Sequence, residues 1–192
     1  NSSSTKGQNA LAFGSGEIRM DFNEIVSRFN AGERHFEGVH CRGNLVAGSL
    51  PGIIMSSATM ESINIEDSDF RGADLSKAFI NGQLRRINLS DADLKETTFA
   101  CKHPLYPHVT LSTCLEQANL EKTNLMGANL EECSLVYANL KGADLRSSNL
   151  RKADLRSADL RGANLTEALL EGANLCRADL SDAILTESSL EK

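Results

Sequence analysis

A leucine occupies every fifth position from Leu115 to Leu190, sixteen times in succession. The residue two places before each leucine is small, alanine in eleven of the sixteen cases, and the residue just before it is mostly Asn or Asp. On an α-helix, five residues advance about 500°, so successive leucines point in different directions around the cylinder. On a flat strand, an odd spacing sends them to opposite faces. Neither regular element gives these leucines a common core.

A chain that bends once in every pentad does satisfy the pattern. Four bends of about 90° close a square, so about twenty residues make one coil, with the leucine and the small residue pointing inward. Coils of this kind stack at about 4.8 Å, the ordinary distance between strands. Asn and Asp suit the bends because their side chains bond nearby backbone groups. The predicted core centres are Leu115, Leu120, Leu125, Leu130, Leu135, Leu140, Leu145, Leu150, Leu155, Leu160, Leu165, Leu170, Leu175, Leu180, Leu185 and Leu190.

The front half of the chain keeps this period less strictly. The phase holds from Leu45 to Leu75, but Ile53 and Ile63 occupy slots that otherwise carry small residues. One residue of the period is then lost around Phe79–Ile80. We therefore expect wider or irregular early coils.

The period breaks after Phe99 and restarts at Leu115, which predicts a protruding loop at about 100–113. Recognition of partners concentrates on loops that a rigid scaffold positions. The interaction candidates in this segment are Lys102, His103, Tyr106 and His108.

The same loop holds two cysteines and two histidines, residue types that bind zinc. Three interpretations stay open: a loop without metal, a Cys101–Cys114 disulfide, and a metal site. The spacing matches no standard zinc site, so no metal is expected. The four weak metal candidates are Cys101, His103, His108 and Cys114.

Residues 20–34 are predicted to form a short helix. An apolar stripe at helical spacing runs through Phe22, Ile25, Val26 and Phe29. Asp21 is placed to begin this helix, with Glu24 three residues on, and Gly32 is placed to end it. The stripe either covers the first coil, which we prefer, or binds a partner. Residues 1–19 are Ser/Gly-rich and aperiodic, and are interpreted as a tag or a disordered arm.

The pentads "ADLRS", "ADLRG", "ANLTE", "ANLKG" and "ADLSD" resemble the A(D/N)LXX signature of the pentapeptide-repeat family. The resemblance implies an all-β solenoid, a right-handed quadrilateral β-helix over 35–192, here with a short N-terminal α-helical cap. The segment "FNAGERHFEG" is similar to the lead-in of cyanobacterial members. A leucine-rich repeat is a poorer match, because its unit is about 20–29 residues and asymmetric.

Composition narrows the classes of function. The net charge of −6 gives no basic patch for nucleic acid, and no apolar run approaches the length of a membrane span. No Gly-rich phosphate loop, nucleophile elbow or paired-histidine motif is present. Five cysteines, without a repeating spacing, do not resemble a secreted disulfide framework. We expect a cytoplasmic protein without cofactor that is not an enzyme; a signal peptide removed earlier stays an open alternative.

The remaining cysteines have structural interpretations. Cys133 replaces an inward alanine and is expected to be inert core, and Cys41 is expected to fill an inward place in the first coil. Cys176 follows Leu175 and is expected to be exposed.

The resemblance also implies a possible activity, because the best-known members mimic duplex DNA with an acidic rod that binds DNA gyrase. Residues about twenty apart are expected to share a face, and such columns carry both signs of charge, as in Glu132 and Lys152. The four arginines that look like a basic stripe fall on different faces. They are Arg146, Arg151, Arg156 and Arg161. Mixed charge disfavours DNA mimicry.

The C-terminal coils carry two apolar residues, Leu169 and Ile184, at outward slots where Asn or Asp is usual. An uncovered end of a β-helix has unpaired backbone groups that invite association. Family members often dimerise through this end. We predict a homodimer through the C-terminal coil that involves Ile184, Leu185, Leu190 and Leu169; a monomer protected by terminal Glu and Lys is the alternative.

The sequence therefore predicts a non-enzymatic protein–protein interaction scaffold that contacts an unknown protein partner through its loop and rod faces. A DNA-mimicking modulator of gyrase is the alternative. A redox- or metal-responsive switch at the cysteine-containing loop is a remote one.

Overall fold

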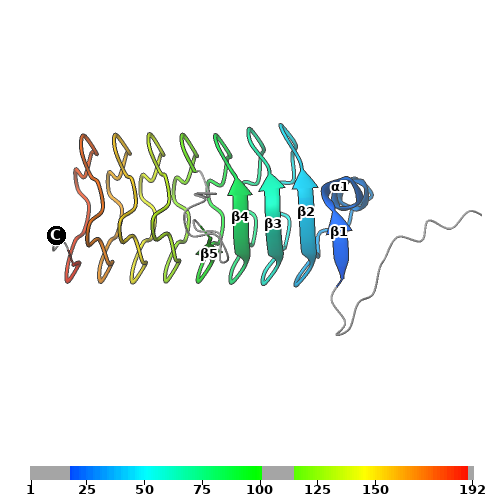
Figure 1. Ribbon diagram of the computed structural model, residues 1–192, viewed down its shortest axis with the longest axis horizontal. Helices are drawn as coiled ribbons and strands as arrows, with labels where there is room; N and C mark the ends of the chain where they lie inside the picture. Colours follow the sequence, from blue (N-terminus) through cyan, green and yellow to red (C-terminus); the bar gives the residue numbers. More distant parts are fainter. Residues whose placement is uncertain (1–17, 101–114, 190–192) are drawn as a thin grey trace, which may run out of the picture.

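The computed structural model describes residues 18–100 and 115–189, which form a rod of stacked coils (Figure 1). In the rear half of the rod, parallel bridges recur every five residues and join residues twenty apart, as in Asn119 with Asn139 and Asn124 with Asp144; several bridges of the front half join residues nineteen apart, as in Asp69 with Asn88. One coil is thus four pentads, and the chain forms a β-helix. The backbone N–H and C=O groups of each pentad form hydrogen bonds within its own turn and with the two neighbouring coils.

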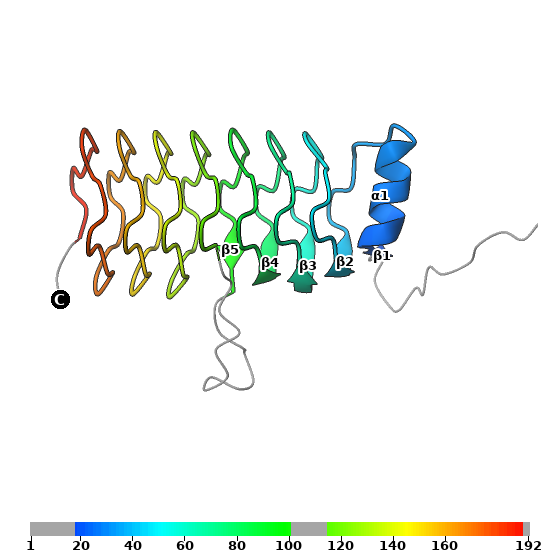
Figure 2. The same ribbon diagram turned by 90° about the horizontal axis from the view of Figure 1, so that it is seen from above.

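The single helix of the described residues, α1, spans Phe22–Asn30 and lies at the N-terminal end of the rod, across its long axis (Figures 1 and 2). Asp21 begins it by accepting a 2.8 Å hydrogen bond from the Glu24 N–H. Gly32 follows its end with a φ of 102°. The buried residues of α1, Phe22, Ile25 and Phe29, face the first coil.

The helix is shorter than the expected 20–34, because the chain before it is a strand. β1, Arg19–Asp21, pairs in parallel with β2, His40–Asn44, so Arg19, in the segment interpreted as a tag or arm, is part of the sheet. The strand was missed because three residues carry no readable alternation.

A parallel sheet in the order β1-β2-β3-β4-β5 forms one side of the front half. Its later strands are β3, Thr59–Asn64, β4, Phe79–Gln83, and the short β5, Thr98–Phe99. Beyond β5 the described coils are joined by isolated bridges.

The expected irregularity of the early coils is present in this sheet. The register shifts between Cys41 and Gly43, and again between Glu61 and Ile63. A Cβ at Gly82 would collide with the Ile63 carbonyl oxygen, so the close approach of these two strands requires glycine.

Every regular pentad turns in the same way. The N–H of the small residue donates to the carbonyl of the leucine three places earlier, as from Ala163 to Leu160 at 3.0 Å. The residue between them, two after the leucine, has a positive φ, whether it is Gly162 at 65° or Lys152 at 55°. Nineteen residues other than glycine adopt this conformation among those described, so the turn overrides the usual preference for glycine.

The core runs along the rod axis. Leu145 and Leu165, stacked twenty apart, are completely buried, whereas Leu185 in the last described coil is only partly buried. Inward Ile53 and Ile63 are buried as well, so the early coils accept larger side chains at slots that later hold alanine.

Candidate functional site

The structure places part of the predicted site. Leu169 is half-buried and bridges Asn149 and Ser189, and Ile184 is 49% exposed in the last described coil. The loop candidates lie outside the described residues, and so do both cysteines of the alternative Cys101–Cys114 disulfide. These residues are Cys101, Lys102, His103, Tyr106, His108 and Cys114.

The predicted core centres separate into three groups. Those from Leu115 to Leu170 are buried, with at most 2% exposed. Leu175, Leu180 and Leu185 are partly buried and pack against the core, and Leu190 lies outside the described residues. The change in burial shows that apolar side chains of the repeat meet solvent in the end coil.

The cysteines correct one expectation. Cys41 is free and buried, and burial raises the pKa of its thiol to about 12. Cys176 is free and exposed. Cys133, expected to be an inert core thiol, is instead disulfide-bonded. The inward slot at Cys133 is fully buried, so its pattern predicted packing but gave no sign of a covalent partner.

The Asn or Asp before each leucine has a structural task. Its Oδ1 accepts a hydrogen bond from the N–H two residues on, as between Asn129 and Glu131 at 3.2 Å. Its amide also bonds the next coil: the Asn139 Nδ2 donates to Asn119 Oδ1 at 3.0 Å. This polar residue therefore closes a turn and ties coils together, which leaves less of its chemistry available for a ligand.

Where the pentad reads Asp-Leu-Arg, the two charged side chains neutralise each other. The Arg161 guanidinium lies 2.6 Å from a carboxylate oxygen of Asp159, and Arg146 and Asp144 repeat this geometry. The hydrogen bond from Arg161 holds the pKa of Asp159 below its usual value. Pairs of the same kind join Asp69 to Arg71 and Asp154 to Arg156.

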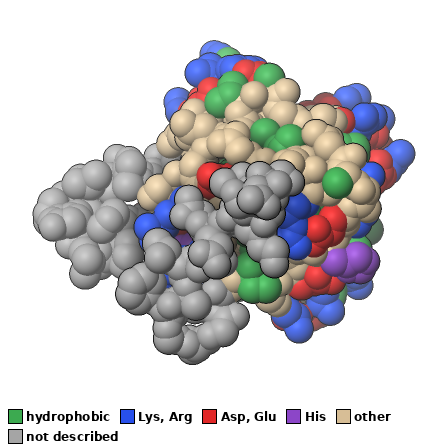
Figure 3. Space-filling model, turned by 90° about the vertical axis from the view of Figure 1, so that its right-hand side faces the viewer, with side chains coloured by type: hydrophobic (Ala, Val, Ile, Leu, Met, Phe, Trp, Pro, Cys, Tyr) green, Lys and Arg blue, Asp and Glu red, His purple; other side chains and the backbone are tan. Residues whose placement is uncertain are grey.

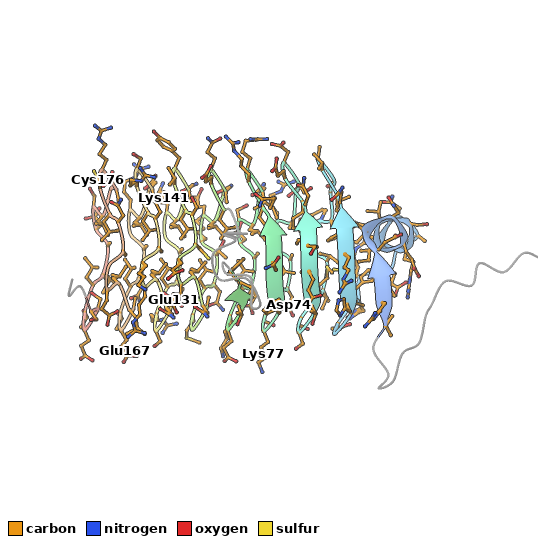
Figure 4. The ribbon with its side chains drawn as sticks, in the orientation of Figure 1. Asp74, Lys77, Glu131, Lys141, Glu167 and Cys176 are labelled. Carbon is orange, nitrogen blue, oxygen red and sulfur yellow. The ribbon has the colours of Figure 1, made fainter. Side chains whose placement is uncertain are left out.

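Charges also pair between coils, as the mixed columns predicted. Lys152 lies 3.4 Å from Glu132, and Arg151 lies 3.1 Å from Glu171. Glu131, Lys141 and Glu167 lie in the C-terminal half of the rod (Figure 4). The N-terminal end is mixed as well, with Lys and Arg beside Asp and Glu (Figure 3). These pairs place a positive group beside a negative one in each of the two columns.

A surface groove over Cys176 was missed by the sequence reasoning. It is lined by Val136, Tyr137, Arg156, Ser157, Cys176 and Arg177. These residues are three adjacent pairs spaced twenty apart, so the period itself was the signal that would have gathered them.

Two further classes of site were sought in the described ranges. No group of three or more His, Cys, Asp and Glu side chains is placed there to hold a metal ion. No helix in residues 18–100 and 115–189 has the length and apolar character needed to cross a membrane.

Comparison with solved structures found pentapeptide repeat proteins. HetL, involved in heterocyst differentiation regulation in the cyanobacterium Nostoc sp. strain PCC 7120, is 27% identical, with 89% of this chain and 97% of HetL covered and a TM-score of 0.39. Rfr23 from the cyanobacterium Cyanothece 51142 is 25% identical, with 88% and 99% covered and a TM-score of 0.40. A trypsin-treated form of QnrB1, a plasmid-mediated fluoroquinolone resistance protein, is 21% identical, with 83% and 86% covered and a TM-score of 0.48.

A search of curated proteins gave no match. A family model described as pentapeptide repeats, in eight copies, matches residues 113–151, 123–162 and 153–191. The matched segments cover the coils with strict five-residue spacing and stop short of the irregular front half. Residues 113–191 of this chain are therefore pentapeptide repeats, and the solved structures to which the chain is similar are pentapeptide repeat proteins.

Proposed function

We propose that this chain is a non-enzymatic scaffold that binds a protein partner through the surface of its rod and its loop. The observation that carries the proposal is how the polar groups are used. The interior of the described coils is filled by apolar side chains, mainly leucine and alanine in the rear half, and outward Asp, Asn and Arg side chains close turns or pair with each other. Groups committed in this way are poor general acids, bases or nucleophiles.

The partner-binding surfaces of this scaffold are proposed to be the loop and the C-terminal coil. Lys102, His103, Tyr106 and His108 supply the loop's candidates. At the other surface, Ile184 exposes 49% of its area where the repeat normally holds a polar residue. Both are places at which the regular pattern is interrupted, so their side chains are not required by the turns.

The test is affinity capture with a deletion chosen to preserve the stack. Asn88 pairs with Asn119 across a separation of 31 residues instead of twenty. Removal of 102–112 restores the spacing of twenty and leaves a continuous β-helix. We expect a partner captured by the wild type to be lost with this deletion, and to bind the purified wild type at micromolar concentration or tighter. The surface variant Lys77→Gly serves as the matched control and keeps the partner.

Inhibition or protection of DNA gyrase at micromolar protein in a supercoiling assay would contradict this proposal and favour DNA mimicry. The paired charges argue against that outcome. Lys152 with Glu132 and Arg161 with Asp159 interrupt any run of negative charge along the rod.

For the architecture, we propose that each coil is right-handed and four-sided, and that α1 serves as the cap of the first coil. Four bridge positions per coil support the four sides. The burial of Phe22 and Ile25 supports the cap. Replacement of Ile25 by Asp is expected to unfold the front coils before the rear ones, as seen by hydrogen exchange.

We also propose a homodimer through the C-terminal coil. The Leu165 N–H donates to Ile184 at 2.7 Å, but among the described residues the N–H of Leu185 has no such acceptor, and its side chain is only partly buried. Light scattering at high micromolar concentration should give twice the monomer mass, and Ile184→Glu should give the monomer. Tyr137→Glu is the control for added surface charge and should remain dimeric.

A cytoplasmic location also remains a proposal. The free thiols of Cys41 and Cys176 support it. The disulfide at Cys133 argues for a more oxidising compartment, because disulfides seldom persist in a reducing one. Fractionation of source cells with an antibody to the chain decides between them.

A further inference from the structure

The groove over Cys176 crosses three successive coils, is open to solvent and has a volume of about 350 Å³. Its lining comes from the first two turn positions after Leu135, Leu155 and Leu175, so the six side chains lie in two columns along the rod. Cys176 lies at the C-terminal end of the rod (Figure 4). A volume of this size accommodates a small molecule of the mass of a tripeptide.

The groove carries an excess of positive charge. Arg156 is paired with Asp154 at 2.6 Å, so these two cancel. Arg177 is exposed, and no described residue forms an ion pair or a side-chain hydrogen bond with it. One guanidinium is therefore left to bind a carboxylate, which it does with two parallel hydrogen bonds.

The groove also holds a nucleophile and an aromatic wall. The Cys176 thiol is free and exposed, and its backbone N–H is held by Asn174 at 3.1 Å. Tyr137, 63% exposed, stands on the first of the three coils and walls the groove on the side toward the N-terminus. Guanidinium groups beside a thiol attract an anionic disulfide to it and can hold that disulfide's carboxylate by hydrogen bonds.

We propose that this groove is a modification site in which Cys176 forms a mixed disulfide with a small anionic disulfide of the glutathione class. Cys176 gives its proton to solvent, and its sulfur attacks one sulfur of the incoming disulfide. A new S–S bond forms to Cys176, the original S–S bond breaks, and the other half leaves as a thiolate. The disulfide is itself the oxidant, and Arg177 holds a carboxylate of the half that stays bound. The scaffold thereby gains a reversible negative group near its C-terminal end.

The next turn along the coil provides an internal control. Ser181 follows Leu180 as Cys176 follows Leu175, so Ser181→Cys puts a thiol in the same backbone setting. There the place of Arg177 is taken by Asp182, and Asp179 lies on the same turn. A thiol at Ser181 meets negative charge where Cys176 meets positive charge.

The experiment measures the rate of adduct formation by mass spectrometry, on protein kept without reductant. Three probes are compared at equal concentration and low salt: oxidised glutathione, neutral hydroxyethyl disulfide and cationic cystamine. We expect the rate ratio of oxidised glutathione to cystamine to be about tenfold higher at Cys176 than at Ser181→Cys in a Cys176→Ser background. Salt at about 1 M should remove most of the difference.

Variants of Arg177 distinguish the effect of its charge on the reaction rate from the effect of the accessibility of the Cys176 thiol. Arg177→Gln should lower the ratio at Cys176 toward that of the control, Arg177→Lys should keep most of it, and the neutral probe should react equally with all three proteins. Equal ratios at Cys176 and at Ser181→Cys would overturn the proposal, as would peptide mapping that places the glutathione adduct elsewhere. Both outcomes are independent of whether a protein partner is ever found.

Discussion

The guanidinium of Arg161 and the carboxylate of Asp159 are joined by hydrogen bonds of 2.8 Å and 2.6 Å, and the same carboxylate accepts the Arg161 backbone N–H at 3.1 Å. Two residues that flank one inward leucine thus close the turn and neutralise each other. The geometry recurs at Asp144 and Asp154. It makes the Asp-Leu-Arg pentad a self-contained unit with no net charge.

These pairs predict a dependence of stability on pH. Arg161 and the equivalent arginines lower the pKa of Asp144, Asp154 and Asp159 in the folded state. A depressed carboxyl pKa stabilises the fold above the unfolded value of about 3.9 and loses that contribution as the pH falls through the folded one. The urea midpoint should therefore be flat near neutrality and fall below about pH 4. Asp159→Asn keeps the turn acceptor but not the charge, so it should flatten this fall; an unchanged pH profile would contradict the assignment.

The positive φ of the turn residue predicts that removing a glycine there lowers stability and that introducing one raises it. Gly72 has a φ of 63° and Lys77 one of 59°. A Cβ at Gly72 would meet nothing within 4 Å, so the backbone conformation alone is tested. Gly72→Ala should destabilise by about 1 kcal/mol, and Lys77→Gly should stabilise by about 0.5 kcal/mol, measured by urea unfolding. Changes of the same sign would show that the strain is relieved elsewhere.

The stacked coils predict that replacing an inward leucine by alanine lowers the free energy of unfolding by an amount that depends on its burial. Leu145 is fully buried between coils, and Leu185, forty residues later in the same column, is only partly buried. Leu145→Ala should cost about 2–5 kcal/mol in the free energy of unfolding, and Leu185→Ala clearly less. If dimerisation covers the last coil, the difference should narrow at high protein concentration. Equal costs in a dilute monomer would be inconsistent with the exposed end coil.

The free cysteines should differ in reactivity. Burial raises the pKa of Cys41 to about 12, so little thiolate is present at neutral pH, and the thiol is also screened from reagents. Iodoacetamide should alkylate Cys176 in the native protein and reach Cys41 only after denaturation. Peptide mass spectrometry before and after guanidinium treatment measures both; native labelling of Cys41 at the rate of Cys176 would contradict the buried position.

Much of the fold was predictable because one spacing determines it. Leucine every fifth residue placed Leu145 and Leu165 inside, and Asp21 with Glu24 placed the start of α1. The strand β1 was not predictable, since Arg19 and Asp21 acquire strand geometry only from pairing with β2. The disulfide at Cys133 was equally hidden, because an inward small residue and a bonded cysteine occupy the same slot.

The candidate site was harder to predict because its members are distant in sequence. The charge columns were correctly anticipated as mixed, yet the closer pairing of Asp159 with Arg161 within one pentad was overlooked. Tyr137, Arg156 and Arg177 look unremarkable one at a time, and only the twenty-residue register brings them to one groove. In a chain with this period, the residues that share a surface are found by comparing positions twenty apart as well as neighbouring positions.

In the regular coils, the pairing of residues twenty places apart also governs how such a chain changes length. Duplication of four pentads adds one complete coil and leaves the pairing of all other residues unchanged. Duplication of a single pentad keeps each leucine inside but moves every later surface side chain to the next face of the rod. There it contacts different residues in the two neighbouring coils. The same interior thus supports many different exteriors, and the two vary independently.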